Sequence, residues 1–415
     1  MTQPSRLHLF QGYGVELEYM IVDRDTLQVR SITDELLKHE LGEYGSDFEN
    51  GMVTWSNELV MHVVELKSTK PELDFDVLKN AFHDNVKRIN TILVKWNAML
   101  MPTAAHPFMH PAKETKLWPH DNNEVYTIYN TIFDCTGHGW SNLQSTHLNL
   151  PFADPVEFAK LHAAIRLVLP LLPALCASSP ILDGKSSGYL DTRLTYYKTN
   201  QSRIPSITGQ VIPEAIFSKS DYENLIFEKI KKDITPFDSE NILDPVWVNS
   251  RGAITRFDRG SIEIRIMDVQ ECPSADLAIV SLVNETLKAF VKEQFISLKD
   301  QMKWDAAPLA ELLDKTILAG PQAIFQNTDY LKIFGIPKKS ASAKEIWQTI
   351  VNQLVDADNS TVKKWMPELT VILAEGTLSE RILKSLNDDF SIESLKKVYK
   401  KLALCLAENR MFAKS

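Results

Sequence analysis

The stretch G-V-E-L-E-Y, residues 14–19, decides how this chain folds, because acidic and apolar residues alternate in it without a break. Successive side chains of a β-strand point to opposite faces of the sheet. Glu16 and Glu18 therefore share one face, and the apolar residues between and beside them share the other. The alternation predicts a strand that packs one face on a core and turns the other to a polar cleft.

Two later stretches repeat this pattern with different polar residues. T-H-L-N-L, residues 146–150, places His147 and Asn149 on one strand face, and S-I-E-I-R-I, residues 261–266, does the same with Glu263 and Arg265. Carboxylates gathered at one site stay charged together only if a cation lies among them. Because a divalent metal ion that carries polyphosphate is the commonest such cation, the three strands predict a metal–phosphate site.

Composition restricts the class of protein. A chain of 415 residues with 44% hydrophobic and 24% charged residues is typical of a soluble globular protein. The formal net charge of −9, without any run of Lys or Arg, argues against a nucleic-acid partner. Small molecules are therefore the expected partners, and the sequence leaves a homo-oligomer open.

The expected location is the cytoplasm. Met1 to Phe10 lacks an apolar core long enough for a signal peptide, and the most apolar run, Ile165 to Cys176, is too short to span a bilayer. The four cysteines show no paired spacing, which is typical of reduced thiols. We therefore expect no membrane partner.

The order of elements predicts an α+β fold with an antiparallel or mixed sheet and helices on its back. We expect helices over 71–99 and over 155–176, the second capped by Asp154, and a loop over 180–245 that folds over something. Capping-box pairs at Ser342 and Thr377 open further helices. The predicted domains are a catalytic domain, 1–299, and a helical C-terminal subdomain, 300–415.

Other candidate site residues have equally plausible structural roles. Glu58 and Glu65 are seven residues apart, so on one regular strand they would point to opposite faces; a shared site requires a bulge, or a turn between two strands. His106 in H-P-F can simply fix its loop, and Arg193 and Arg203 can be solvated loop residues.

Arginines gather near the third strand. Four lie within fifteen residues, and their planar forks match phosphate and carboxylate oxygens: Arg251, Arg256, Arg259 and Arg265. An acidic metal site beside an arginine cluster suits phosphoryl transfer. No G-x-x-x-x-G-K-[ST] occurs, so a P-loop is excluded as the ATP-binding device.

With these motifs in order, the chain resembles the type 2 glutamate–cysteine ligases, or bacterial carboxylate–amine ligases, over about residues 10 to 290. The resemblance rests on G-V-E-L-E-Y, the E-L…V-E-L region, H-P-F, T-H-L-N-L, A-S-S-P-I-L-D-G and I-E-I-R-I-M-D followed by P-S-A-D-L-A. It implies a glutamine synthetase-like catalytic fold, in which an antiparallel sheet forms a funnel for ATP and Mg²⁺, with Mn²⁺ as a substitute. Many bacterial members read H-x-H where this chain has His147 and Asn149.

The resemblance also implies a role for each candidate. One metal group would be Glu16, His147 and Glu263, and the other Glu18, Glu58 and Glu65. Arg265, Arg259 and Asn149 would bind the nucleotide. Arg193 or Arg203, with His106, would bind the substrate, and Arg265 and Arg193 would act in catalysis.

The predicted function is an ATP-dependent carboxylate–amine ligase. Transfer of the γ-phosphoryl group to a carboxylate makes an acyl phosphate, which an amine then attacks. Glutamate as the acid, cysteine as the amine and a place in glutathione biosynthesis follow from the resemblance alone. The alternatives are a phosphotransferase of the guanidino-kinase type and a non-catalytic sensor that binds nucleotide or amino acid.

Overall fold

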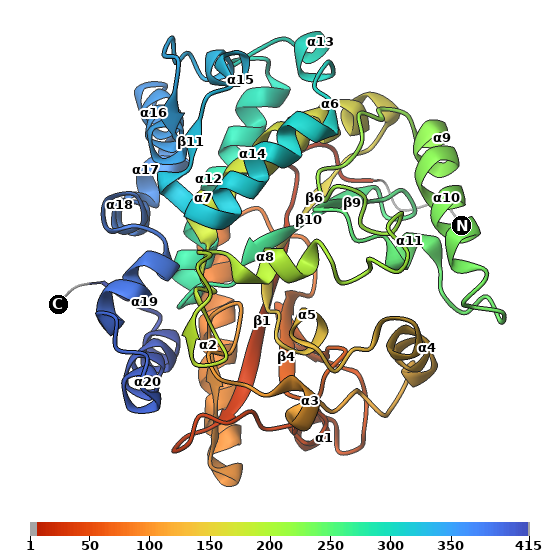
Figure 1. Ribbon diagram of the computed structural model, residues 1–415, viewed down its shortest axis with the longest axis vertical. Coiled ribbons are helices and arrows are strands. Elements are labelled where there is room, and N and C mark those ends of the chain that lie inside the picture. Colours follow the sequence, from red (N-terminus) through yellow and green to blue (C-terminus); the bar gives the residue numbers. More distant parts are fainter. Residues whose placement is uncertain (1–5, 414–415) are drawn as a thin grey trace.

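An eight-stranded antiparallel sheet forms the centre of the computed structural model, which describes residues 6–413 (Figure 1). The strand order is β2-β3-β4-β1-β6-β10-β9, and β5 also pairs with β1. The strands are β1 (Gly14–Asp23), β2 (Asp47–Asn50), β3 (Val53–Asn57), β4 (Val63–Ser68), β5 (Ala98–Met101), β6 (Ser145–Pro151), β9 (Ala253–Arg256) and β10 (Ser261–Asp268). Two small sheets pair β7 (Ile181–Leu182) with β8 (Lys185–Ser186), and β11 (Ile324–Phe325) with β12 (Ala341–Ser342).

Helices surround this sheet. Those before residue 250 are α1 (Thr33–Leu41), α2 (Phe75–Leu93), η1 (Val94–Trp96), α3 (Pro111–Glu114), α4 (Asn123–Phe133), α5 (His138–Ser141), α6 (Pro155–Val168), η2 (Leu169–Leu171), α7 (Pro173–Cys176), α8 (Thr192–Tyr197), α9 (Lys219–Tyr222), η3 (Glu223–Phe227), α10 (Glu228–Ile234) and α11 (Pro245–Val248). Those after it are α12 (Pro273–Val291), α13 (Leu298–Gln301), α14 (Ala306–Ala319), η4 (Gly320–Gln322), α15 (Thr328–Ile333), α16 (Ala343–Asp356), α17 (Ser360–Lys364), α18 (Met366–Glu375), α19 (Leu378–Leu386) and α20 (Ile392–Glu408). In Figure 1, α16 to α20 lie along one side of the molecule, and α4 and α9 to α11 lie on the opposite side.

One face of the sheet is buried, as the alternating residues predict. Val15, Leu17 and Tyr19 of β1 are fully buried in a core cluster that they share with residues of α2, α6 and α12. Burial of such side chains stabilises the fold by roughly 1.5–3 kcal/mol each. These helices therefore hold the back of the sheet, and the acidic residues of β1 lie on the front.

The front face changes character half-way along β1. Met20 and Val22 continue the face of Glu16 and Glu18, but they are apolar and fully buried in a second cluster with residues of α19 and α20. The C-terminal helices thus cover one half of this face and leave the acidic half to a cleft.

The predicted helix over 71–99 is wrong at both ends. The helix α2 begins only after Asp74, whose side chain accepts a hydrogen bond from the backbone N–H of Asp76, and it ends at Leu93. Asn97 then adopts a left-handed conformation (φ 51°), and the chain turns into β5. The sequence did not reveal β5, because its four residues, A-M-L-M, form a segment too short and too uniformly apolar to show the alternation of a strand.

Two other predictions need correction. Asp154 does cap α6, but the predicted helix to Cys176 is divided into α6, η2 and α7, because Pro170 and Pro173 cannot donate helical hydrogen bonds. The region 180–245 is not only loop, since it contains α8 to α10. Both capping boxes are confirmed, at Ser342 and Thr377. The domain boundary at 300 stays a prediction.

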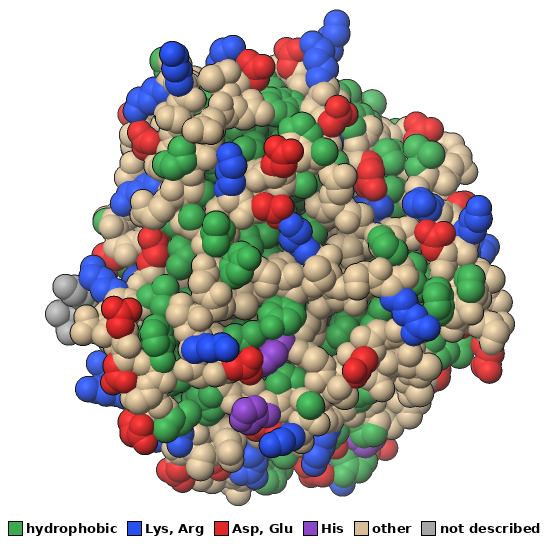
Figure 2. Space-filling model, viewed as in Figure 1, with side chains coloured by type: hydrophobic (Ala, Val, Ile, Leu, Met, Phe, Trp, Pro, Cys, Tyr) green, Lys and Arg blue, Asp and Glu red, His purple; other side chains and the backbone are tan. Residues whose placement is uncertain are grey.

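The surface shows mixed charge. On the face in Figure 2, acidic and basic side chains of the described residues are interspersed, without a large patch of one sign. Within residues 6–413, no helix is both long and apolar enough to cross a membrane.

Candidate active site

Strand register brings the predicted site residues together on the front face. Glu16 of β1 lies between two cross-strand partners, Lys67 of β4 on one side and His147 of β6 on the other. One step along the same face, Glu65 lies opposite Glu18. On the other side of β6, Asn149 lies opposite Glu263 of β10. Side chains opposite each other on one face are about 4.5–5.5 Å apart at Cβ, so the three separate motifs form one site.

Glu16, His147 and Glu263 form a group that fits a metal ion. Their ligand atoms all lie within 4.8 Å of one another, and among the described residues they are the only such group. His147 Nδ1 is 2.7 Å from Glu16 Oε2 and 3.6 Å from Glu263 Oε1. Two carboxylates and one imidazole suit Mg²⁺ or Mn²⁺. This is the first of the two metal groups that the family resemblance implies.

Ionisation in this group favours opposite charges. Burial alone would raise the pKa of Glu16, but the hydrogen bond and charge of His147, followed by Arg265 and Lys67, lower it to about 2. Burial would likewise lower the pKa of His147, but Glu16, Glu263 and Glu18 raise it above its ordinary value. Each of the two side chains, Glu16 and His147, thus favours the charged form of the other.

The second predicted group, Glu18, Glu58 and Glu65, is less tightly assembled. Glu58 lies in the turn between β3 and β4, which is one of the two arrangements that a shared site requires. Burial and the charge of Glu18 raise the pKa of Glu58 to about 8, and burial raises that of Glu65 well above its usual range. Lys67, which the sequence analysis missed, lies 3.3 Å from Glu65 Oε2 and is the cation nearest this group.

Arg265 reaches the cleft beside the first group. Its Nε lies 3.1 Å from Glu263 Oε1, and its charged form is stabilised, with a raised pKa, mainly by Glu263, against the cost of burial. The register between β10 and β6 shifts between Ile264 and Met267. Arg265 lies in this bulge, and bulges often redirect side chains next to active sites. Asn149 donates to Glu16 Oε1 at 3.0 Å, so it also belongs to the first group.

Arg193 lines the cleft, but it is largely committed to the protein interior. Its side chain is 2% exposed, and its Nε donates to Asp268 Oδ1 at 2.6 Å. Its other nitrogens lie 3.4–3.5 Å from the backbone carbonyl of Arg265. A guanidinium held in this way supports the strand that carries Arg265 and offers little of its fork to a substrate.

Three predicted site residues lie away from the cleft lining. His106 is fully buried, and its Nε2 is bonded to the carbonyl of Leu27, so it fixes its loop. Arg203 donates to the carbonyl of Ile132 and stacks on Phe237. The side chain of Arg259 is 71% exposed, and it pairs with Asp258 at 3.8 Å. The structure therefore does not bring these residues to the site.

The arginine cluster of the sequence also divides. Arg251 is buried and forms two hydrogen bonds to the carboxylate of Glu214, so its role is structural. Arg256 instead lines the cleft, where it pairs loosely with Asp258 at 3.4 Å. Arg251 and Arg256 are close in the sequence and differ in their burial, which the linear sequence does not reveal.

The cleft itself is open and has a volume of about 350 Å³. Its front wall consists of residues that the sequence analysis did not identify, because they come from α4, α5, α8, α11 and the adjoining loops. They are mainly aromatic or amide side chains: Tyr126, Tyr129, Trp140, Tyr197, Asn200, Gln201 and Trp247. The ring of Tyr129 packs edge-on against Trp140 and Trp247.

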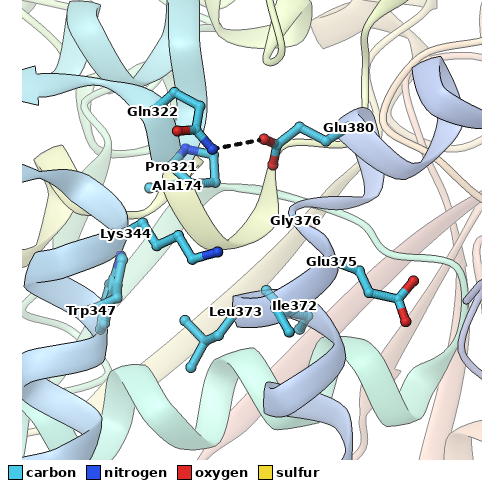
Figure 3. A pocket seen from close by; sticks show the side chains of 11 residues that line it. Ala174, Pro321, Gln322, Lys344, Trp347, Ile372, Leu373, Glu375, Gly376 and Glu380 are labelled. Atoms are coloured by element: carbon cyan, nitrogen blue, oxygen red, sulfur yellow. Dashed lines mark hydrogen bonds between the residues drawn. The ribbon is translucent and has the colours of Figure 1, made fainter.

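A second, smaller cavity of about 60 Å³ lies between η4, α16 and α18 (Figure 3). Lys344 extends into it above Leu373, and Gln322 bonds to Glu380 at its rim. None of the residues that line it also lines the cleft at the sheet.

Comparison with known proteins identifies the family of this chain. The pattern of Glutamate-cysteine ligase family 2 (GCS2) matches residues 13–312, which carry every acidic strand described above. The chain belongs to glutamate–cysteine ligase family 2. An uncharacterised protein of Archaeoglobus fulgidus is 30% identical over 402 residues, which cover 96% of this chain and 99% of that protein. A putative glutamate–cysteine ligase 2 of Bradyrhizobium sp. is 25% identical over 65% of this chain and 60% of its own length.

A solved structure supports the fold of this GCS2 member. The glutamate–cysteine ligase of Francisella tularensis, in complex with AMP, superposes with a TM-score of 0.56 at 12% identity, covering 94% of this chain and 88% of that one. This likeness confirms the predicted glutamine synthetase-like fold.

Proposed function

We propose that this protein is an ATP-dependent carboxylate–amine ligase that joins glutamate to cysteine. The observation that carries the proposal is the group formed by Glu16, His147 and Glu263, beside Arg265, on the floor of an open cleft. Membership of glutamate–cysteine ligase family 2 supports the reaction, and the choice of glutamate and cysteine rests on the family's name.

Glu16, His147 and Glu263 would hold a Mg²⁺ or Mn²⁺ ion, whose chemistry is to carry the phosphates of ATP and neutralise their charge. Glu18, Glu58 and Glu65 line the same cleft and would serve the second metal group. Burial, followed by neighbouring carboxylates, raises the pKa of Glu58 and of Glu65, and a bound cation would favour their charged forms.

A carboxylate is a poor acyl donor, so the reaction begins with transfer of the γ-phosphoryl group from ATP to the acid. Arg265 is positioned to offset the charge that develops on the transferred group. The amine then attacks the acyl phosphate, the C–O bond to phosphate breaks, and the amine loses a proton. The aromatic side chains that line the cleft would shield the acyl phosphate from water, which would otherwise hydrolyse it.

The substrate carboxylate requires a cation that is available in the cleft. Arg193 is held by Asp268, whereas Arg256 lines the cleft and is only loosely paired. We therefore assign Arg256 to the substrate carboxylate, which a planar fork can bind through two hydrogen bonds.

Trapping with hydroxylamine tests the proposal. With ATP, Mg²⁺ and glutamate, hydroxylamine should replace the amine, and glutamyl hydroxamate should accumulate together with phosphate. The Glu263→Gln variant should produce neither. A phosphoramidate product without hydroxamate would indicate the phosphotransferase. Tight ATP binding with no hydroxamate from any acid would indicate the sensor, and either result would overturn the ligase assignment.

A further inference from the structure

The hydroxyl group of Ser145 connects the two acidic groups of the cleft. Its Oγ lies 2.9 Å from Nε2 of His147 and 3.0 Å from Oε2 of Glu18. The same Glu18 oxygen accepts the backbone N–H of Ser145 at 2.7 Å. Ser145 is 6% exposed, so these protein groups, and not bulk water, determine where its hydroxyl hydrogen points.

A count of donors fixes the direction of these hydrogen bonds. A carboxylate can only accept, so the Ser145 hydroxyl donates to Glu18. Having used its single hydrogen, Ser145 Oγ must accept from His147, and Nε2 of His147 must therefore carry a proton. By the same count, Nδ1 donates a proton to Glu16 Oε2 at 2.7 Å. If a metal ion replaces that proton, the proton on Nε2 stays with Ser145, and the lone pair of the ring lies on Nδ1.

Nδ1 is the nitrogen that faces the first metal group. It lies 2.7 Å from Glu16 Oε2 and 3.6 Å from Glu263 Oε1, while Nε2 points toward Glu18. A ring with its proton on Nδ1 would direct an N–H at the metal position and could not act as a ligand there. The orientation of the Ser145 hydroxyl thus decides whether His147 can be a ligand.

We propose that Ser145 is a positioning residue that keeps His147 in the tautomer required for metal binding, with Glu18 holding the serine hydroxyl. This inference rests on the proposed function, because it takes the first acidic group to be a metal site. In this arrangement Glu18 belongs to the second metal group and also contributes to the first one through its hydrogen bond with Ser145. Outer hydrogen-bond partners of metal-ligating histidines usually change metal affinity by about 10- to 100-fold.

Mn²⁺ binding to the full-length protein, measured by electron paramagnetic resonance without ATP, provides the test. Ser145→Ala should weaken the tighter Mn²⁺ site by at least about tenfold. Ser145→Thr should restore most of the affinity, because it keeps the hydroxyl and threonine suits a strand. Thr146→Val is the matched control: it removes a buried hydroxyl, hydrogen-bonded to Asp276 at 2.6 Å, from the next position of the same strand.

The outcomes separate this inference from the proposed function. Failure of the unaltered protein to bind Mn²⁺ would refute the metal site and the inference together. Normal Mn²⁺ affinity in Ser145→Ala, or equal loss in Ser145→Ala and Ser145→Thr, would refute the inference alone. If Thr146→Val weakened Mn²⁺ binding as much as Ser145→Ala, the effect would be a general response of β6, and the inference would also be wrong.

Discussion

At the scale of single residues, the cleft gathers five carboxylates, those of Glu16, Glu18, Glu58, Glu65 and Glu263. Lys67 and Arg265 pair with Glu65 and Glu263, while burial, followed by the charge of Glu18, raises the pKa of Glu58 to about 8. A divalent cation that enters such a site favours the charged form of its carboxylates. Two predictions concern individual residues of this site.

Glu263→Gln should lower the affinity for Mn²⁺ by more than about tenfold and abolish ATP turnover, because it removes one charged ligand of the first group. The fold should survive, since the Glu263 side chain is partly solvated at 13% exposure. Metal binding by calorimetry and secondary structure by circular dichroism would check both parts. Glu49→Gln, an exposed residue of the edge strand β2, is the control. Unchanged Mn²⁺ affinity in Glu263→Gln would remove it from the metal site.

Metal affinity should increase with pH. Glu16 raises the pKa of His147 despite burial, so at lower pH the ring is protonated on both nitrogens and cannot be a ligand. Below this raised pKa, one proton competes with each metal ion, and the Mn²⁺ dissociation constant should rise by about tenfold per pH unit. Titrations with Mn²⁺ from pH 6 to pH 9 would measure this dependence of the dissociation constant on pH. An affinity independent of pH would show that His147 is not a ligand.

At the scale of elements, α8 is attached to β10 by a buried ion pair. Asp268, fully buried at the end of β10, accepts hydrogen bonds from Arg193 Nε, from the backbone N–H of Ser178 and from Ser179 Oγ. Arg193 in turn contacts the carbonyl of Arg265 in the bulge. The pair thus fixes both the helix and the bulged strand that carries a cleft arginine.

Asp268→Asn should destabilise the protein by about 3–5 kcal/mol, because it leaves the buried guanidinium of Arg193 without its charged partner. The free energy of unfolding in urea would measure the loss. Asp314→Asn removes the partner of Lys198 at the surface and should cost less than about 1 kcal/mol. Equal, small losses in both variants would show that the pair does not hold α8.

At the scale of the whole molecule, a continuous core supports the site from behind. The main cluster includes residues from Tyr13 to Leu406, and the second cluster joins the sheet to α19 and α20. Several buried histidines lie around this core and stay neutral. Burial lowers the pKa of His62 and of His106 to about 4.

The free energy of unfolding should therefore fall as the pH falls from about 6.5 to about 4. In that window His62 binds a proton in the unfolded chain, whereas buried His62 in the folded protein stays unprotonated. His62→Gln cannot titrate but can keep the hydrogen bond to the carbonyl of Ser141. It should remove up to about 3 kcal/mol of the decrease. Urea unfolding at pH 7 and pH 4.5 would compare the variant with His39→Gln, an exposed control. The same pH dependence in both variants would contradict this account.

Local sequence is enough to predict the three strands that carry the site, together with their acidic motifs. Alternation over residues 14–19, 146–150 and 261–266 is a local property, so the faces of Glu16, His147 and Glu263 follow from the period of a strand. Only the tertiary structure decided which arginines reach the cleft, because burial depends on packing between distant segments: Arg251 lies inside, and Arg256 lies in the cleft. The contacts of Ser145 and the aromatic wall of the cleft also depend on the tertiary structure. They are formed across strands and between helices, and such contacts leave no pattern of spacing in the sequence.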